Sequence, residues 1–520
     1  MPQAPAGTID ATVVRLQQAA AALPARSHAE LAALANACCR SVAAVADDWV
    51  ATSRAAKGWT ALADSTAEEW GSGPVPVARF LRLVVQRCTA LARGEMPTGA
   101  AADGTTQATV PARGLGDRLL LRGVRAQLEF AVPPLPAPAV PHGDTALVLG
   151  AGNVTATALL DVIDQVFLRG RAVWLKPSPL HERLAPVFAG ALAPLGEAGL
   201  LHVAGGDAAA GARLAAHPGI AAVHLTGAVA TAAALRGDPE VAAKDFTAEL
   251  GCVTPAFVLP GAWRDHELQH AAAQLAAFTA WNGGATCVAP RVVLTARGWP
   301  QRDAFVAHLA AALAALPPRP PFHPATREHF ATATGAPAPA GPLPPTLCAG
   351  IDPVADTARF AQEHFAPVLL ELPLAGDTLA AWLAAATTFA RERLAGALSA
   401  YAFAPPRVLA PQRATVDAQL RALPHGTLAI NTWTGLGFGL GLPWGVPAGA
   451  PWQHGIGFAR DLSGRAPLRR GVVEAPFRSW PAPPWLPGRR SAPATLRALT
   501  HHYAAPSWHR LATTALHGLR

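Results

Sequence analysis

The sequence predicts an α/β protein with two parallel-sheet domains, an N-terminal helical layer and a C-terminal extension. Three observations lead to this prediction. Short apolar runs alternate with helical stretches from residue 145 onward, and repeated strand–helix units build parallel sheets covered by helices. Residues 11–93 show helical periodicity alone. A chain of 520 residues is too long for one hydrophobic core.

The N-terminal part is predicted to be helical, because leucines recur at three- and four-residue steps between residues 11 and 93. A small, polar segment at 99–109 and a proline-rich segment at 133–141 are expected to be connectors around a short strand near 119–130. We therefore assign residues 1–135 to a helical segment that joins the next domain.

Strand–helix units follow, and residues 136–258 are predicted to form a nucleotide-binding domain. Its first strand ends in Gly150-Ala151-Gly152-Asn153. Dinucleotides bind such sheets beyond the carboxyl ends of the strands, where Lys176 and Thr226-Gly227 are expected to lie. The strands are expected at 145–149, 172–175, 200–203 and 221–225.

A second α/β domain is assigned to residues 259–440. A helix at about 266–281 leads into Gly283-Gly284-Ala285-Thr286-Cys287, and a strand at 291–294 follows. Residues 317–345 are so rich in proline and alanine that we expect a surface excursion. The C-terminal extension, 441–520, carries little readable periodicity.

Composition argues against several classes of protein. No long, uniformly apolar stretch stands out and the N-terminus lacks signal-peptide features, so neither a membrane span nor export is expected. The six cysteines are scattered, which suits a reducing cytoplasm, and we assign no metal site. The net charge of +8 is spread along the chain rather than gathered in a basic run, so nucleic-acid binding is not expected.

Cys287 is the candidate nucleophile, since the flexible glycine turn before it would let a substrate carbon approach its sulfur. The alternative for a lone cysteine is an inert, buried small hydrophobe. Glu249 lies among apolar residues, where a raised pKa would suit a general base, although a capping or paired carboxylate is the alternative. Asn153 could donate to an oxyanion, or simply cap a helix.

Lys176 and Thr226-Gly227 are candidate nucleotide contacts. An ammonium group at a strand end could hold ribose hydroxyls or a phosphate, and backbone amides that open a helix could approach a pyrophosphate. The alternatives are an ordinary surface lysine and an ordinary strand–helix turn. A GxGxxG fingerprint is missing from this part of the sequence.

Together these segments resemble the aldehyde dehydrogenase superfamily over roughly residues 140–460. Their order carries the resemblance, because each match is short. The matches are Asn153 followed by Lys176-Pro177-Ser178, His224-Leu225-Thr226-Gly227-Ala228, Glu249-Leu250-Gly251, Trp281 to Cys287, Glu363-His364-Phe365-Ala366-Pro367, Ile430-Asn431-Thr432 and His454-Gly455-Ile456-Gly457.

The resemblance implies two Rossmann-related domains and oxidation of an aldehyde with NAD or NADP. Cys287 would attack the carbonyl carbon, the amide of Asn153 would hold the oxyanion, and Glu249 would activate water to release a carboxylic acid. Dimers or tetramers are implied as well. The implied cofactor contacts are Lys176, Ser178, Thr226, Gly227, Leu250, Glu363 and Phe365, with Lys176 and Glu363 on the two riboses and Phe365 beside the nicotinamide.

Departures from the family pattern keep two alternatives open. Gly-Ala-Gly precedes Asn153, whereas hydrolytic members carry Pro-Trp there. This part of the sequence is closer to that of acyl-CoA reductases, in which coenzyme A replaces water. The presence of Glu249 favours hydrolysis. Pro179 stands where NAD-preferring members often carry an acid, and Cys252 replaces a glycine. The other alternative is an inactive, nucleotide-binding relative, against which the joint presence of the three catalytic residues argues.

Overall fold

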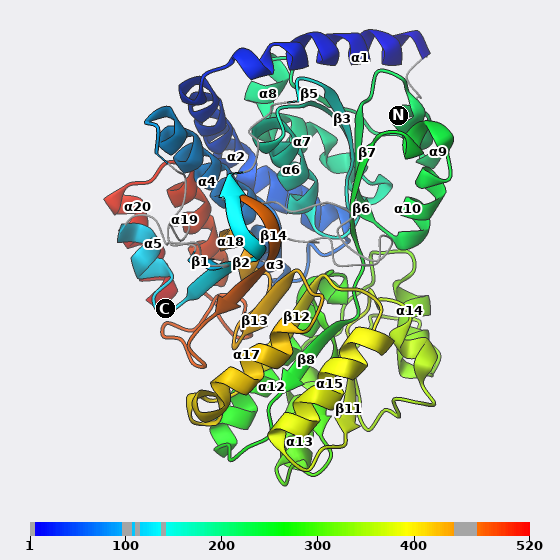
Figure 1. Ribbon diagram of the computed structural model, residues 1–520, viewed down its shortest axis with the longest axis vertical. Helices are drawn as coiled ribbons and strands as arrows, with labels where there is room; N and C mark the ends of the chain where they lie inside the picture. The colour runs from blue at the N-terminus through cyan, green and yellow to red at the C-terminus, as the bar shows by residue number, and fades with distance from the viewer. Residues whose placement is uncertain are drawn as a thin grey trace.

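Two sheets form the body of the protein in the computed structural model, which describes residues 6–95, 107–109, 115–136, 142–440, 442 and 465–519. The upper lobe in Figure 1 holds a parallel five-stranded sheet with the order β5-β4-β3-β6-β7. Its strands are β3 (Thr145–Leu149), β4 (Ala172–Lys176), β5 (Leu201–Val203), β6 (Ala222–Gly227) and β7 (Asp245–Leu250). The α/β class and the predicted strands of this domain are confirmed.

Helices join these strands. The most apolar is α6 (Thr155–Ile163), whose nine residues are all buried beside β3, β4 and β6. The others are η3 (Pro179–Leu184), α7 (Ala185–Ala191), α8 (Ala193–Glu197), α9 (Ala208–Ala216), α10 (Val229–Arg236) and α11 (Pro239–Ala242). As in other parallel sheets, the carboxyl ends of all five strands meet at one edge.

The lower lobe holds a nine-stranded sheet with the order β1-β2-β14-β13-β12-β8-β9-β11-β10. Six strands, β8 to β13, form its parallel core, whereas β14 pairs with β2, and β2 with β1, in antiparallel fashion. The parallel strands are β8 (Thr254–Val258), β9 (Pro290–Ala296), β10 (Thr346–Cys348), β11 (Val368–Leu374), β12 (Ser399–Phe403) and β13 (Thr427–Ile430). Because β8 lies in this sheet, the chain passes from one sheet to the other between Leu250 and Thr254, earlier than the expected boundary after residue 258.

Helices flank the nine-stranded sheet and fill its core with apolar side chains. The longest, α12, runs from Asp265 into the loop that precedes Cys287. The flanking helices are α12 (Asp265–Ala280), α13 (Arg302–Ala314), α14 (Thr326–Thr334), α15 (Leu379–Arg393), α16 (Pro406–Leu409) and α17 (Arg413–Arg421).

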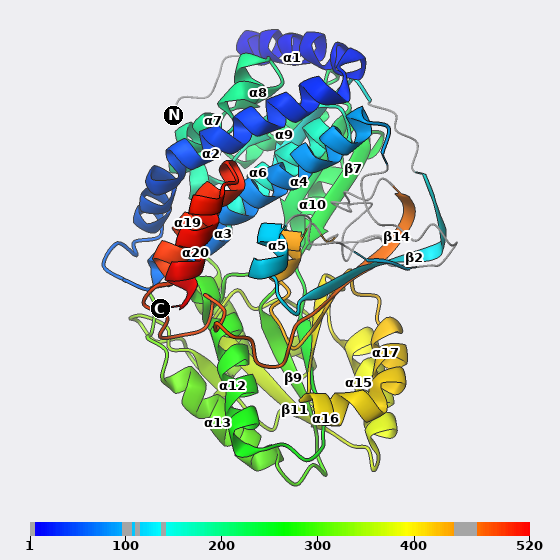
Figure 2. The ribbon, with the colours of Figure 1, turned by 90° about the vertical axis from the view of Figure 1, so that its left-hand side faces the viewer.

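A helical layer covers the five-stranded sheet, as the N-terminal periodicity predicts. Figure 2 shows α2 and α4 side by side with the C-terminal helix α19 against them. A capping box between Ser27 and Glu30 starts α2. The layer consists of α1 (Ala6–Ala21), α2 (His28–Ala56), α3 (Ser65–Ser72), α4 (Pro74–Ala92), α19 (Ala492–Ala504) and α20 (Trp508–Leu519).

The helix α2 is also, within the described part of the chain, the one helix long and apolar enough to span a membrane. Its residues Cys38, Cys39, Val42 and Trp49 are fully buried in the core that α2 shares with α4 and the five-stranded sheet. These contacts account for the apolar residues on the buried side of α2, and 28% of its most apolar window is buried inside the structure.

Two expectations for the remaining segments differ from the structure. The strand expected at 119–130 is replaced by α5 (Leu115–Leu120) and by β2 (Arg125–Pro136), which continues into the first of the prolines. The C-terminal extension is integral to the fold, since β14 (Arg465–Glu474) pairs with β13.

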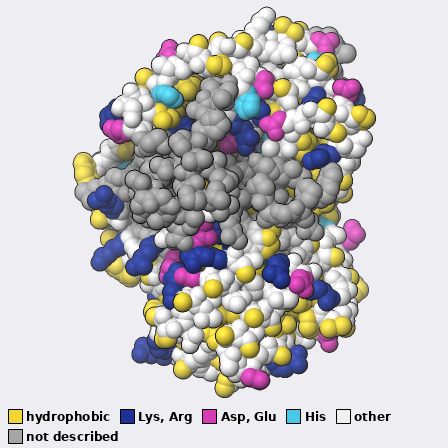
Figure 3. All heavy atoms as spheres, viewed as in Figure 1, with side chains coloured by type: hydrophobic (Ala, Val, Ile, Leu, Met, Phe, Trp, Pro, Cys, Tyr) yellow, Lys and Arg dark blue, Asp and Glu magenta, His cyan; other side chains and the backbone are white. Residues whose placement is uncertain are grey.

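The second difference concerns residues 317–345, which are not simply a surface excursion. This segment contains α14, and Leu343 and the charged residue Arg319 are both buried. The ion pairs that Arg319 makes with the N-terminal layer account for its burial. On the face drawn in Figure 3, Lys and Arg side chains lie on both lobes, several beside Asp or Glu.

Candidate active site

The loop before Cys287 reverses the chain through three consecutive left-handed residues. Asn282, Gly283 and Gly284, in η4 (Trp281–Gly284), have φ values of 56°, 63° and 80°. Glycine adopts such angles without a steric penalty, and asparagine adopts them at a lower energetic cost than most other residues. A Cβ on Gly284 would lie 2.2 Å from the carbonyl carbon of Ala366, so only glycine fits. The glycines in this motif are therefore required by the path that brings Cys287 back toward β9.

Arg291, in β9, forms hydrogen bonds with the backbone of this loop. Its guanidinium is fully buried and donates to the carbonyl oxygens of Gly284 at 2.7 Å, Thr286 at 3.1 Å and Ala366 at 2.9 Å. The same guanidinium lies 3.7 Å from Oε1 of Glu363. Arg291 thus connects the segment from Trp281 to Cys287, called here the nucleophile loop after the predicted role of Cys287, to the segment that carries Glu363. Arg291 was not among the site residues predicted from the sequence, where its signal is a charged residue inside an apolar strand.

Two carboxylates act on Cys287. Burial raises the pKa of the Cys287 thiol well above its ordinary value, and the charges of Glu249 and Glu363 raise this pKa further. Glu249 lies near the end of β7 and is 2% exposed. Burial also raises the pKa of Glu363 to about 7, against the opposing influence of Arg291. At neutral pH the resting residue is therefore a thiol beside two buried acids.

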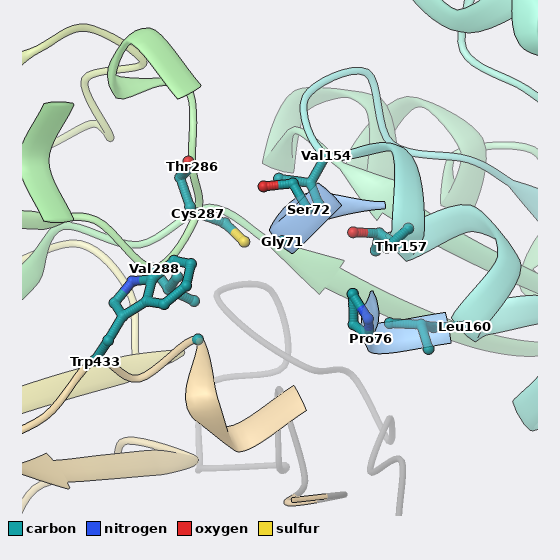
Figure 4. A pocket seen from close by; sticks show the side chains of 12 residues that line it. Gly71, Ser72, Pro76, Val154, Thr157, Leu160, Thr286, Cys287, Val288 and Trp433 are labelled. Carbon is teal, nitrogen blue, oxygen red and sulfur yellow. The ribbon is translucent and has the colours of Figure 1, made fainter. Parts of the chain in front are cut away.

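Cys287 lines a pocket formed by four separate segments of the chain. Figure 4 shows it pointing from its loop toward residues of α3, α4 and α6. The described lining contains small, aliphatic and aromatic side chains but no charged one. The lining is Gly71, Ser72, Pro76, Val154, Ala156, Thr157, Leu160, Thr286, Cys287, Val288, Trp433 and Gly435. The site accordingly suits an uncharged, apolar group next to the sulfur of Cys287.

Asn153 lies beside this pocket. Val154, which follows it, lines the pocket and occupies the cap position of α6, so Asn153 is not the cap of that helix. The backbone oxygen of Asn153 accepts a hydrogen bond from Nδ2 of Asn282 at 3.0 Å. The same Nδ2 donates to the carbonyl of Ala285 at 2.9 Å, two residues before Cys287. One asparagine therefore links Asn153 to the nucleophile loop.

The other predicted contacts divide between the sheet edge and the core. Lys176 ends β4 with its stem against Gly211 of α9, and no described group lies within hydrogen-bonding distance of its Nζ. Ser178 accepts from the amide of Leu180 at 3.4 Å at the start of η3. Gly227 ends β6 at the same edge. These three residues lie where a nucleotide would approach the sheet.

Thr226 and Leu250 point elsewhere. The hydroxyl of Thr226 donates to Oδ2 of Asp161 in α6 at 2.8 Å, and the side chain of Leu250 is buried in the core of the five-stranded sheet. Only the backbone of these two residues is therefore available to a ligand. Phe365 is half-buried beside the Cys287 loop, with its ring 5.4 Å from that of His323 and 6.0 Å from the guanidinium carbon of Arg291.

Comparison with known proteins agrees with this geometry. Residues 141–328, which include Asn153, Glu249 and Cys287, match the model of the aldehyde dehydrogenase family. Across this segment the chain is similar to the aldehyde dehydrogenase family, in agreement with the resemblance of its sequence motifs. The match covers all five strands of the five-stranded sheet and the first part of the second domain.

Solved structures of the superfamily share the fold over most of the chain. A Mycobacterium tuberculosis aldehyde dehydrogenase complexed with NAD+ is 21% identical, with a TM-score of 0.60 and 91% of each chain covered. An aldehyde dehydrogenase of the moss Physcomitrella patens, solved with succinate, is 14% identical with a TM-score of 0.61 and covers 91% of each chain. An NADP-dependent enzyme of Escherichia coli is 19% identical, with a TM-score of 0.58 and 83% of each chain covered.

Of the superfamily's late landmarks, one is described. Ile430 ends β13, and the side chain of Asn431 forms two hydrogen bonds of 2.9 Å with the backbone of Ala404, which fixes the turn leading to the pocket residue Trp433. The segment His454-Gly455-Ile456-Gly457 lies outside the described residues.

Proposed function

We propose that this protein oxidises an aldehyde to a carboxylic acid with NAD or NADP, using Cys287 as a covalent nucleophile. The observation that carries the proposal is the position of Cys287, which lines a pocket formed by four segments of the chain and whose thiol pKa is raised by the charges of Glu249 and Glu363. A buried, inert cysteine would need neither the pocket nor the neighbouring acids.

The carboxyl edge of the five-stranded sheet fits a dinucleotide. The aliphatic part of Lys176 is buried, and among the described residues its Nζ has no hydrogen-bond partner. Gly206, at the β5–α9 turn beside Lys176, carries no side chain, so a ligand can come close to the backbone there. Solved structures of the fold include an NAD+ complex and an NADP-dependent enzyme, so both dinucleotides stay candidates. When bound, the nicotinamide ring would accept the hydride from the substrate carbon.

Each protein residue then has a role in the proposal. Lys176 and Glu363 would bind the two riboses, and Phe365 would pack beside the nicotinamide. The Cys287 thiol loses its proton to Glu249, and the sulfur bonds to the carbonyl carbon to give a thiohemiacetal. The side-chain amide of Asn153 and the backbone N–H of Cys287 would donate to the resulting oxyanion.

After the oxidation the substrate is a thioester on Cys287. Glu249 first passes the proton it took from the thiol to solvent. Again a carboxylate, it takes a proton from water, the hydroxide bonds to the acyl carbon, and the carbon–sulfur bond breaks to release the acid and the thiolate. Coenzyme A as the acyl acceptor is the alternative. The buried carboxylate of Glu249 favours water, because water is a far weaker acid than a thiol and depends more strongly on a base when it attacks.

We further expect a homodimer or homotetramer in a reducing cytoplasm. All six cysteines are free thiols in the structure, in agreement with such a compartment. A resident membrane segment is not part of the proposal, since the apolar helix α2 is packed within the fold.

The purified protein should reduce NAD+ or NADP+ with apolar aldehydes in the absence of coenzyme A, as followed by the absorbance of the reduced cofactor. Cys287→Ala should abolish turnover, whereas Cys348→Ala, in β10 at the far edge of the nine-stranded sheet, should not. Glu249→Gln should let the acyl-enzyme accumulate, which mass spectrometry of the intact protein detects.

Product formation only in the presence of coenzyme A would establish the acylating alternative. No cofactor reduction with any aldehyde under either condition would support an inactive relative. Normal steady-state turnover by Glu249→Gln would remove Glu249 from the mechanism.

A further inference from the structure

A buried ion pair of the N-terminal layer reaches the nucleophile loop. Lys57, at the end of α2, lies 2.6 Å from Oε1 of Glu69 on α3, and their side chains are 2% and 1% exposed. Nζ of Lys57 also donates to Oδ1 of Asn282 at 2.7 Å. A charged pair of a distant helical layer therefore contacts the residue that begins the turn toward Cys287.

The contact with Lys57 determines which way the Asn282 amide faces. Its Nδ2 donates to the carbonyl oxygens of Asn153 and Ala285, and its backbone N–H donates to Oε2 of Glu68 at 3.2 Å. Turning the amide over would place its oxygen against two carbonyl oxygens and its NH2 group against an ammonium. Only the observed orientation satisfies the ammonium of Lys57 and both carbonyl oxygens, and it joins Asn153 to the loop of Cys287.

A second set of contacts holds the same two elements together. Glu68 forms a bidentate ion pair with Arg319 at 2.8 and 3.0 Å, and Nε1 of Trp59 donates to the carbonyl of Pro320 at 3.0 Å. The ring of Trp59 lies under Gly283, where an added Cβ would be 3.2 Å away. Because these contacts already fasten the layer to the second domain, the Lys57 contact is not needed merely to attach it.

We propose that Lys57 is a positioning residue for catalysis, which acts through Asn282 to set the placement of the Asn153 amide relative to the Cys287 sulfur. The proposal rests on the function proposed above. A buried ion pair contributes little net stability compared with apolar residues of the same volume. A displacement of about 1 Å at a reacting centre, in contrast, can cost roughly a hundredfold in rate.

The central variant is the double substitution Lys57→Met/Glu69→Met. It replaces both members of the ion pair with apolar side chains of similar size, so that neither charge is left buried alone. We expect kcat to fall roughly 10- to 100-fold with an unchanged KM for the cofactor, since the sheet edge is not touched. The matched control is Lys244→Met. Lys244 donates to the carbonyls of Ala215 and His217 in the nucleotide-binding domain and should leave kcat unchanged.

A double-mutant cycle separates positioning from a general loss of structure. Asn282→Ala and Lys57→Met should each lower kcat, and the double variant should be no worse than the poorer single variant, because both remove one linkage. Multiplicative losses, or a folded Lys57→Met/Glu69→Met variant with wild-type kcat, would overturn the proposal.

Alkylation of Cys287 by iodoacetamide gives a readout that does not require aldehyde oxidation. We expect the Lys57→Met/Glu69→Met variant to alkylate several-fold faster at Cys287, because the loop is held less firmly, and equally fast at Cys348. An unchanged rate at Cys287 contradicts the positioning role even if the wild-type protein oxidises no aldehyde. Lack of oxidation by the wild-type protein, with a changed alkylation rate, contradicts only the proposed function.

Discussion

Cys287 shows how one residue's reactivity depends on the charges around it. Burial is the main cause of the raised pKa of its thiol, and the carboxylates of Glu249 and Glu363 add to it, whereas its own backbone N–H and Arg291 act in the opposite direction. The resting protein thus keeps a neutral thiol in the pocket. A thiolate forms when a neighbouring acid takes the proton or when the negative charge nearby is reduced.

Alkylation of Cys287 should therefore be slow at neutral pH and should accelerate as the pH rises. Glu363→Gln removes a negative charge that raises the pKa of the thiol, so the rise in alkylation rate should move to lower pH. The rate of iodoacetamide labelling, followed by peptide mass spectrometry between pH 6 and 10, measures this; the pH range is roughly that in which thiols titrate. Glu392→Gln, on the surface at the end of α15, serves as control. A shift toward higher pH would disprove the assigned electrostatics.

At the scale of an element, the nucleophile loop is defined by backbone conformation. Three successive left-handed residues turn the chain between α12 and β9, and the backbone of Ala366 and Pro367 leaves no space for a side chain at Gly284. Arg291 donates hydrogen bonds to the carbonyl oxygens of Gly284 and Thr286 in this turn. The loop therefore combines a strained path with a dedicated buried cation, as active-site loops often do.

Gly284→Ala should destabilise the protein by about 2–4 kcal/mol, because a methyl group would collide with the backbone of Ala366 and the left-handed conformation would be strained. The free energy of unfolding in urea is the measurement, with aldehyde oxidation expected to be lost in parallel. Gly298→Ala is the control, since a Cβ there meets no atom within 4 Å. Equal stabilities of the two variants would show that the loop can take another path.

At the scale of the whole molecule, the C-terminal helix α19 packs against α2, α3 and α4 of the N-terminal layer. The pocket wall contributed by α3 depends on a small apolar cluster between the N-terminal layer and α19, in which Leu496 packs with Ala46, Val50 and Trp70. Residues far apart in the sequence thus support Gly71 and Ser72 at the pocket. The C-terminal region contributes to the site through packing.

Leu496→Ala should lower the free energy of unfolding by about 3 kcal/mol, because Leu496 is 5% exposed and its removal leaves a cavity in this cluster. Leu516→Ala, on α20 and 61% exposed, should change it by no more than about 0.5 kcal/mol. Urea unfolding of both variants under one condition makes the comparison. A loss at Leu516 as large as that at Leu496 would mean that the exposed face of α20 is covered in solution.

Local patterns were sufficient for much of the fold. The strands that end at Leu149, Lys176 and Gly227 were predicted because short apolar runs bounded by glycine or proline are a local signal. Arg319 was misjudged because its surroundings in the sequence resemble a surface segment, whereas its partner Glu68 is 251 residues away. Arg291 and Lys57 were missed for the same reason, since each acts on carbonyl or amide groups that only folding brings near.

The sequence alone determined the order of strands and helices and the family motifs around Asn153, Glu249 and Cys287, because periodicity and short motifs depend on residues close together in the chain. Only the tertiary structure decided that β8 and β14 join one sheet, that Thr226 turns its hydroxyl toward Asp161, and that Lys57 holds Asn282. Those outcomes depend on contacts between distant segments, whose energies are settled when burial and hydrogen bonding are satisfied throughout the molecule at once.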